Sequence, residues 1–174
     1  QQQNEGPVYF VGAFGGGSND PIHRKTIEYQ WSGLLIEPVK QSFDMLRHNY
    51  VNDSNIVFEN VVISREHGAR ALYGGGQNPA ASLQRNIDHD TGAVTEELMM
   101  CITLKSLLKK HHIRRIDLLH VDVEGQDIEI IEDFDFIAYY PAVINFETNT
   151  SPARINATLE RLSNLGYTLY NHTW

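Results

Sequence analysis

The chain has 174 residues, 41% of them hydrophobic and 21% charged, which is enough for one globular domain with a substantial buried core. Its formal net charge of −8 argues against nucleic acids and anionic membranes as partners, because both present negative surfaces. Cys101 is the single cysteine, so we expect no disulfide bond within the chain, and no apolar run is long enough to predict a membrane span. We therefore expect a soluble domain of the cytoplasm or of an organelle lumen, while the oligomeric state stays open.

Short β-favouring runs alternate with segments of helical period along most of the chain. This alternation is typical of an α/β fold with a mostly parallel central sheet flanked by helices. Strands are predicted at residues 8–14, 33–37, 56–64, 116–123, 142–147 and 167–171. Helices are predicted at residues 21–30, 39–50, 103–112, 126–136 and 151–166. The last helix has the clearest limits, with Ser151 as N-cap before Pro152 and Gly166 just beyond its end.

Residues 65–100 interrupt this pattern. They contain GGGQNP and the polar stretch RNIDHDTG, and they show no sustained period. A connection of this length is either a tolerated surface insertion or part of a lid over a substrate, and both interpretations stay open. Directly after it, Cys101 lies in LMMCITL, which predicts a buried strand.

The stretch VYFVGAFGGGSNDP, residues 8–21, predicts a strand, a glycine-rich turn and the start of a helix. Asp20 is the expected N-cap and Pro21 the first helical residue, so free backbone N–H groups face the turn. Glycines at such a turn let a ligand approach the backbone closely. Glu37 ends the second predicted strand, where an acidic side chain accepts hydrogen bonds from ribose hydroxyls. Together these features indicate a ligand that contains adenosine.

The turn also narrows the choice of ligand. A phosphate-binding loop of the Walker type needs GK[ST] after its glycines, and no lysine occurs here before Lys25. The dinucleotide pattern GxGxxG fits poorly, since Phe14 takes the place of its second glycine. S-adenosylmethionine is the common adenosine ligand without a pyrophosphate, and it is the ligand that we expect.

Polar residues follow one face of the fourth and fifth predicted strands. The strand period places His120, Asp122 and Glu124 of IDLLHVDVEGQD on one side, and Asn145, Glu147 and Asn149 of NFETN likewise. If the two strands are neighbours, Asp122 and Glu147 converge at the carboxyl edge of the sheet. Carboxylates there can orient the amino group of a cofactor, take a proton from a hydroxyl or hold a divalent cation. Glu124 and Asp127, which precede a predicted helix, are interpreted as residues that favour its dipole.

Several of these motifs occur in the order found in one known family. The segments GAFGGGSNDP, WSGLLIEPV, LLHVDVEGQD with EDFDF, and PAVINFE with LGY resemble the FkbM family of S-adenosylmethionine-dependent methyltransferases. The resemblance covers about residues 8–170 and implies a class I (Rossmann-like) methyltransferase fold, while the length predicts that residues 1–174 form a single domain. It also implies methylation of a hydroxyl on a sugar or natural product.

The resemblance assigns roles to individual positions. It places Gly12, Ala13, Gly15 and Gly17 in the cofactor turn, Glu37 at the ribose, Asn60 and Val61 at the adenine edge, and Asp122 at the end of the fourth strand. Phe14, Asn19, Asp20 and Pro38 adjoin these positions and complete the candidate cofactor-binding set. Asp122 and His120 are the candidate catalytic residues. A metal site stays open, since a strand-end pair such as Asp122 and Glu147 could hold Mg²⁺.

Two positions depart from the family pattern. Phe10 stands where members often have an acidic residue, and Gly15 or Gly16 stands where the turn often carries an acidic residue or asparagine. These departures keep a second hypothesis open, a degenerate methyltransferase fold that binds without catalysis. A third, an NAD-dependent oxidoreductase, shares Glu37 but lacks the glycine spacing.

Overall fold

The computed structural model describes residues 9–11, 21–75, 78–82, 96–123 and 125–170, which form an α/β structure. In chain order the elements are β1 (Tyr9–Val11), α1 (Pro21–Tyr29), β2 (Gly33–Ile36), α2 (Lys40–Asn49), β3 (Ile56–Glu59), β4 (Val62–Ile63), β5 (Gly68–Gly75), β6 (Asn78–Ser82), β7 (Glu96–Ile102), α3 (Leu104–Lys110), β8 (Leu118–Val121), α4 (Asp127–Asp133), α5 (Phe136–Tyr139), β9 (Val143–Phe146) and α6 (Pro152–Asn164). No helix in this described part has the length and apolar character needed to cross a membrane.

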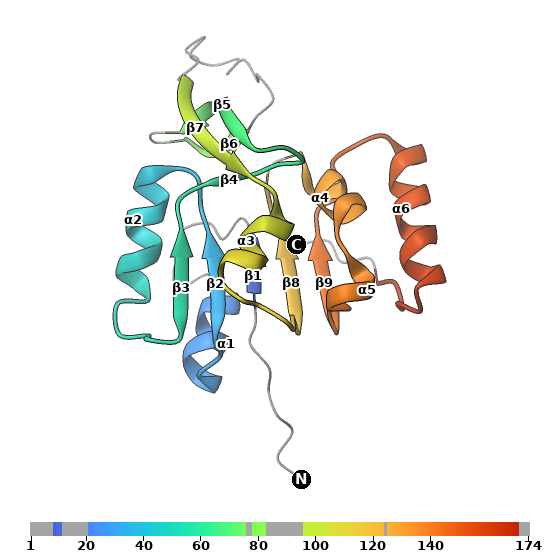
Figure 1. Cartoon of the computed structure of the whole chain (residues 1–174), viewed down its shortest axis with the longest axis horizontal. Coiled ribbons are helices and arrows are strands. Elements are labelled where there is room, and N and C mark those ends of the chain that lie inside the picture. Colours follow the sequence, from blue (N-terminus) through green and yellow to red (C-terminus); the bar gives the residue numbers. More distant parts are fainter. Residues whose placement is uncertain (1–8, 12–20, 76–77, 83–95, 124, 171–174) are drawn as a thin grey trace.

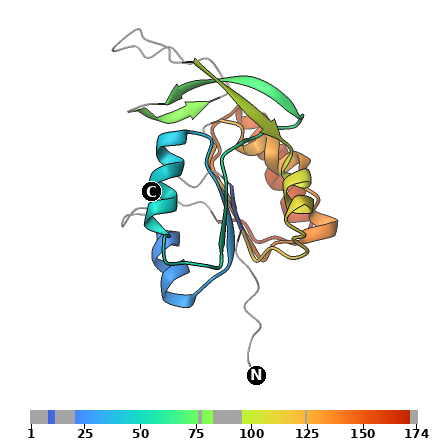
Figure 2. The ribbon, with the colours of Figure 1, turned by 60° about the vertical axis from the view of Figure 1, so that its left-hand side comes forward.

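Parallel strands form the centre of the structure. β8 pairs in parallel with both β1 and β9, and β2 pairs in parallel with β3. β1 also contacts β2, and Figure 1 shows β3, β2, β1, β8 and β9 side by side in that order. In Figure 2, α1 and α2 lie on one side of these strands, and α3 to α6 lie on the other. The carboxyl ends of the parallel strands therefore meet at one edge.

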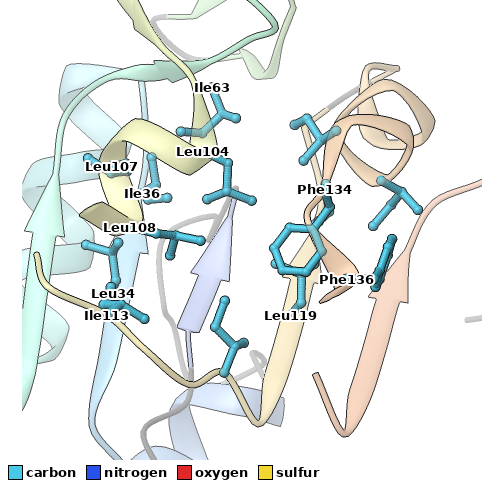
Figure 3. Packing of buried hydrophobic residues seen from close by; sticks show 14 of the residues in the cluster. Leu34, Ile36, Ile63, Leu104, Leu107, Leu108, Ile113, Leu119, Phe134 and Phe136 are labelled. Atoms are coloured by element: carbon cyan, nitrogen blue, oxygen red, sulfur yellow. The ribbon is translucent and has the colours of Figure 1, made fainter. Parts of the chain in front are cut away.

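The core lies on both sides of β2. Leu34 and Ile36 belong to the main apolar cluster, which includes Leu108 of α3 and is drawn in Figure 3. Leu35 points the other way and packs with Leu46 of α2. A strand that is buried on both faces needs an uninterrupted apolar run, which explains the sequence GLLI.

The hydrogen-bonded strands of the described residues fall into three sheets, of order β1-β8-β9, β2-β3 and β4-β7-β5-β6. The last, four-stranded sheet is mostly antiparallel and stands at the top of the molecule in Figure 1. Residues 65–100, which show no sustained period in the sequence, contain β5, β6 and the first part of β7, and the sequence predicts no strand at β5 or β6. Leu72, Met99 and Cys101 form an apolar cluster with Val39 and Val62, so the sheet is fixed to the start of α2. The sequence of β5 does not predict a strand, since it contains alanine, arginine and glycine. The strand forms because it pairs with the distant β7. The prediction that Cys101 lies in a buried strand is confirmed.

The predicted strand over residues 56–64 is divided between the sheet of β2 and β3 and the four-stranded sheet. β3 pairs with β2, whereas β4 pairs with β7. The chain changes sheet at Asn60 and Val61, where the Asn60 amide donates hydrogen bonds to the carbonyl oxygens of Glu37 and Pro38 instead of continuing the ladder. A side chain that bonds to the backbone in this way ends regular pairing.

The helix predicted over residues 126–136 consists of two short helices. Phe134 is extended between α4 and α5, and the Asp135 carboxylate accepts a hydrogen bond from the Ala138 N–H and so begins α5. Sequence spacing missed this break because Phe134 and Phe136 both pack in the main cluster, so the apolar pattern continues across it.

The end of α6 agrees with the prediction, but the strand after it does not form. Gly166 has φ +96° and follows the helix, and the Tyr167 N–H donates to the Leu162 carbonyl oxygen in a Schellman motif. Residues 167–170 are not in a strand, and residue 171 lies outside the described part. The Tyr167 hydroxyl donates to the Pro141 carbonyl oxygen and its ring stacks on Tyr140, so side-chain contacts hold this segment in place of a ladder.

Candidate functional site

The candidate site lies at the carboxyl edge of the parallel strands. Glu37 directly follows β2, Asn60 follows β3, Asp122 follows β8 and Glu147 follows β9. Open α/β sheets bind their ligands at this edge, because loops rather than ladder hydrogen bonds continue from it. The topology therefore brings four of the residues discussed from sequence to one side of the molecule.

Glu37 is a buried carboxylate at this edge, with only 6% of its surface exposed. Its Oε1 accepts a hydrogen bond of 2.8 Å from the Val39 N–H at the start of α2. Burial raises the pKa of Glu37 from 4.5 to about 7, the Val39 hydrogen bond opposes this rise, and the charge of Asp122 adds to it. The last effect means that Asp122 lies near Glu37. Among the described residues, no donor contacts the second carboxylate oxygen, Oε2.

Asn60 holds the ends of β2 and β3 together. Its Nδ2 donates hydrogen bonds of 2.8 Å to the carbonyl oxygens of Glu37 and Pro38, which follow the neighbouring strand β2. Its amide nitrogen is thus engaged by the backbone. We infer that Asn60 positions Glu37, in addition to the adenine-edge role that the resemblance assigns. The side chain of Val61 packs against the main apolar cluster.

His120 and Asn145 form a cross-strand pair. They are register partners in β8 and β9, and Asn145 Nδ2 lies 2.9 Å from His120 Nδ1. Both side chains are half-buried, whereas Leu119 and Val121 on the opposite face of β8 enter the core. The condition that the fourth and fifth predicted strands are neighbours is therefore met. Asp122 and Glu147 follow the paired residues at the two strand ends.

Asp127 connects the turn after β8 to the end of β9. It is 2% exposed, and its two carboxylate oxygens accept hydrogen bonds of 3.3 Å from the N–H groups of Gly125 and Glu147. Gly125 has φ +99°, a backbone conformation that favours glycine. Burial raises the pKa of Asp127, the backbone hydrogen bonds oppose this, and the Glu147 charge adds to the rise. Asp127 thus fixes the turn that carries Asp122 against the neighbouring strand.

The sequence interpretation of Asp127 was incomplete. It does lie in the first turn of α4, where an acidic residue favours the helix dipole. The signal for its second role was its spacing, because Asp127 precedes Ile130, Ile131 and Phe134 by three, four and seven residues. That spacing places its carboxylate on the buried face of the helix.

The remaining predicted site residues are the glycine-rich turn and Pro38. The turn residues Gly12, Ala13, Phe14, Gly15, Gly17, Asn19 and Asp20 lie outside the described residues. Pro38 is half-buried beside Glu37. Within the described part of the chain, no group of three or more His, Cys, Asp or Glu side chains is arranged to hold a metal ion.

Comparison with known proteins adds one finding. The family model of the methyltransferase FkbM domain matches residues 11–169, which include the glycine-rich turn, the carboxyl ends of the parallel strands and all of α6. No curated protein and no solved structure gives a significant match.

Proposed function

The chain belongs to the FkbM methyltransferase family, and from this premise we propose that it transfers a methyl group from S-adenosylmethionine to a hydroxyl oxygen of a small molecule or glycan. We include in this proposal a class I arrangement, in which the five neighbouring parallel strands act as one central sheet of a single domain. The observation that carries it is the family match over nearly the whole chain, together with Glu37 at the carboxyl edge of β2.

Glu37 fits a nucleoside ligand. A buried carboxylate is costly unless its oxygens accept hydrogen bonds, and only Oε1 has a donor among the described residues. A ribose hydroxyl would supply Oε2 with a donor that the described residues do not provide. Asn60 and the Val39 N–H hold the strand end and the carboxylate in place before any ligand binds. Pre-positioned acceptors of this kind reduce the entropy lost on binding.

The chemistry would fall to Asp122 and to His120. When bound, S-adenosylmethionine supplies an electrophilic methyl group. Asp122 would take the proton of the acceptor hydroxyl at its carboxylate, or His120 would take it at the imidazole. Asp127 would keep the turn after β8 in place, and Asn145 would orient the His120 ring. The acceptor must be held in line with the methyl group, because orientation supplies much of the acceleration in such a displacement.

Calorimetry with S-adenosylmethionine, S-adenosylhomocysteine and NAD tests the proposal. We expect the first two to bind and NAD not to bind, and Glu37→Ala to weaken S-adenosylhomocysteine binding by about 1.5–3 kcal/mol. Glu160→Ala, at an exposed position on α6, is the matched control and should bind normally. Equal affinity of the Glu37 variant and the wild type would remove the ribose assignment.

A non-catalytic binding module is the second candidate, and Phe10 in place of an acidic residue is the feature that favours it. The two candidates differ once an acceptor is supplied. The enzyme should transfer a methyl group in the presence of excess chelator, since we propose a metal-free site, whereas the binding module should bind the cofactor without turnover. Turnover that disappears with EDTA and returns with Mg²⁺ would instead make Asp122 a metal ligand.

A further inference from the structure

A cavity of about 220 Å³ lies between α3 on one side and α4 with α5 on the other. Figure 3 shows Leu104 and Leu108 of α3 facing Phe134, which follows α4. The residues that line the cavity do not include Glu37 or Asp122, so it is distinct from the candidate site at the strand ends.

The inner wall of the cavity is apolar. It is formed by side chains that are less than a tenth exposed, namely Ile63, Leu104, Leu108, Ile130 and Phe134. Apolar cavities of about 150 Å³ are known to bind benzene, so a space of this size suits a molecule of one or two rings. The wall therefore favours a ligand with a compact apolar body.

The charged residues around the cavity already have partners. These ion pairs are Arg65 with Asp133 at 3.0 Å, Lys105 with Asp135 at 3.7 Å, and Glu129 with Arg154 at 3.1 Å. A charged ligand would have to break one of these pairs or enter the apolar space without a counter-charge, and both are unfavourable. The charge pattern therefore favours a neutral ligand.

Two polar lining residues retain unused hydrogen-bonding capacity. Gln126 occupies the N-cap position of α4, but its side chain makes no capping hydrogen bond. In the described part of the chain, neither this amide nor the Tyr139 hydroxyl has a hydrogen-bond partner. A ligand with one hydroxyl, amide or N–H group could bond to either of them.

We propose that this cavity binds a small neutral molecule with a one- or two-ring apolar body and a single hydrogen-bonding group. The body packs between Leu104 and Leu108 on one side and Ile130 and Phe134 on the other. The polar group lies toward Gln126 or Tyr139. This site goes beyond the proposed methyl transfer and does not depend on it.

Indole is a suitable probe, because it is neutral and bicyclic and has one N–H group. Titration of the full chain with indole, followed by methyl NMR, should shift the resonances of Leu104, Leu108 and Ile130. Those of Leu46 and Ile56, which belong to the separate cluster beside α2, should stay in place. We expect a dissociation constant of about 1 mM or lower. The cationic analogue tryptamine and the anionic analogue indole-3-acetate should bind at least about tenfold more weakly.

Variants locate the binding in the cavity. Leu104→Phe should fill the space and weaken indole binding at least about tenfold, whereas Leu159→Phe, at a half-buried leucine of α6 that does not line the cavity, should not. Tyr139→Phe keeps the ring and removes the hydroxyl, and with Gln126→Ala it should weaken binding several-fold.

Three results would overturn the proposal. They are the absence of methyl shifts at about 5 mM indole, shifts confined to residues away from the cavity, and unchanged affinity in a folded Leu104→Phe variant. If that variant does not fold, the shifts in the wild-type protein decide the question alone.

Discussion

We expect Glu37 to lower the free energy of unfolding at neutral and higher pH, although its carboxylate has a proposed role in binding the ribose. Its pKa rises from 4.5 to about 7 on folding, mainly because the carboxylate is buried. The folded state therefore favours the protonated form, and the stability this contributes is fully present below pH 4.5 and is lost as the pH rises through about 7. At about 1.4 kcal/mol for each pKa unit, ionised Glu37 costs roughly 3 kcal/mol of folding free energy.

Glu37→Gln removes this cost, because glutamine is close in shape and neutral at every pH. Urea denaturation at pH 5 and at pH 8 measures the effect. We expect the variant to gain stability relative to wild type as the pH rises. The difference in the free energy of unfolding, variant minus wild type, should be about 2–3 kcal/mol larger at pH 8 than at pH 5. Glu160→Gln, at an exposed residue of α6, should change stability by less than about 0.5 kcal/mol at both pH values.

The same substitution should weaken binding of S-adenosylhomocysteine. Ribose hydroxyls donate more strongly to a carboxylate than to a neutral group, so wild-type affinity should rise as the pH increases through about 7. The variant should lack this rise. A relative stability that is the same at pH 5 and pH 8 would refute the assignment of Glu37 as a buried group that ionises near neutral pH. A gain in stability with unchanged binding would leave the burial intact but refute the ribose contact.

Three further predictions concern contacts outside the strand end at Glu37. Asp127→Ala removes the acceptor of two part-buried backbone N–H groups, so it should lower the free energy of unfolding by about 1–3 kcal/mol in urea denaturation, and Asp127→Asn by less. Equal losses in both variants would contradict the assignment of two hydrogen bonds. Cys101→Ser places a hydroxyl in an apolar cluster and should lower the free energy of unfolding by about 1–3 kcal/mol. The native thiol should react with Ellman's reagent only after unfolding, and rapid reaction of the folded protein would contradict its burial. Arg154 bonds to Glu132 through two nitrogens and to Glu129 through a third, so Arg154→Lys should cost about 0.5–1 kcal/mol, with a smaller loss at high salt; a loss that does not depend on salt would indicate packing rather than charge.

The parallel strands could be predicted from sequence because each is encoded locally. Apolar runs such as GLLI and LLHV are bounded by polar or turn residues, and both strands form where the pattern indicates. The limits of α6 could be predicted for the same reason, since Pro152 and Gly166 act on the backbone directly. Predicted strand lengths were too long by one or more residues, because the side-chain pattern continues past the last ladder hydrogen bond.

The four-stranded sheet could not be predicted, because its stability comes from distant contacts. β5 pairs with β7, whose partner residues lie 23 to 33 positions further along the chain, and the buried Leu72 belongs to one apolar cluster with Val39 and Val62. The break at Asn60 was missed for a related reason. The Asn60 amide bonds to the carbonyl oxygens of Glu37 and Pro38, and these contacts depend on the tertiary structure rather than on the local sequence.

Two buried carboxylates at the same edge show how structure separates a positioning group from a ligand-binding one. The pKa values of Asp127 and Glu37 are both raised by burial, which by itself is compatible with either role. Asp127 uses both oxygens to join two backbone segments, so the protein satisfies it completely. Glu37 is satisfied at Oε1 alone among the described residues. Replacing Glu37 with a neutral residue would stabilise the fold above about pH 7. A ligand that donates a hydrogen bond to Oε2, which has no donor among the described residues, would explain a carboxylate at this place near Asp122.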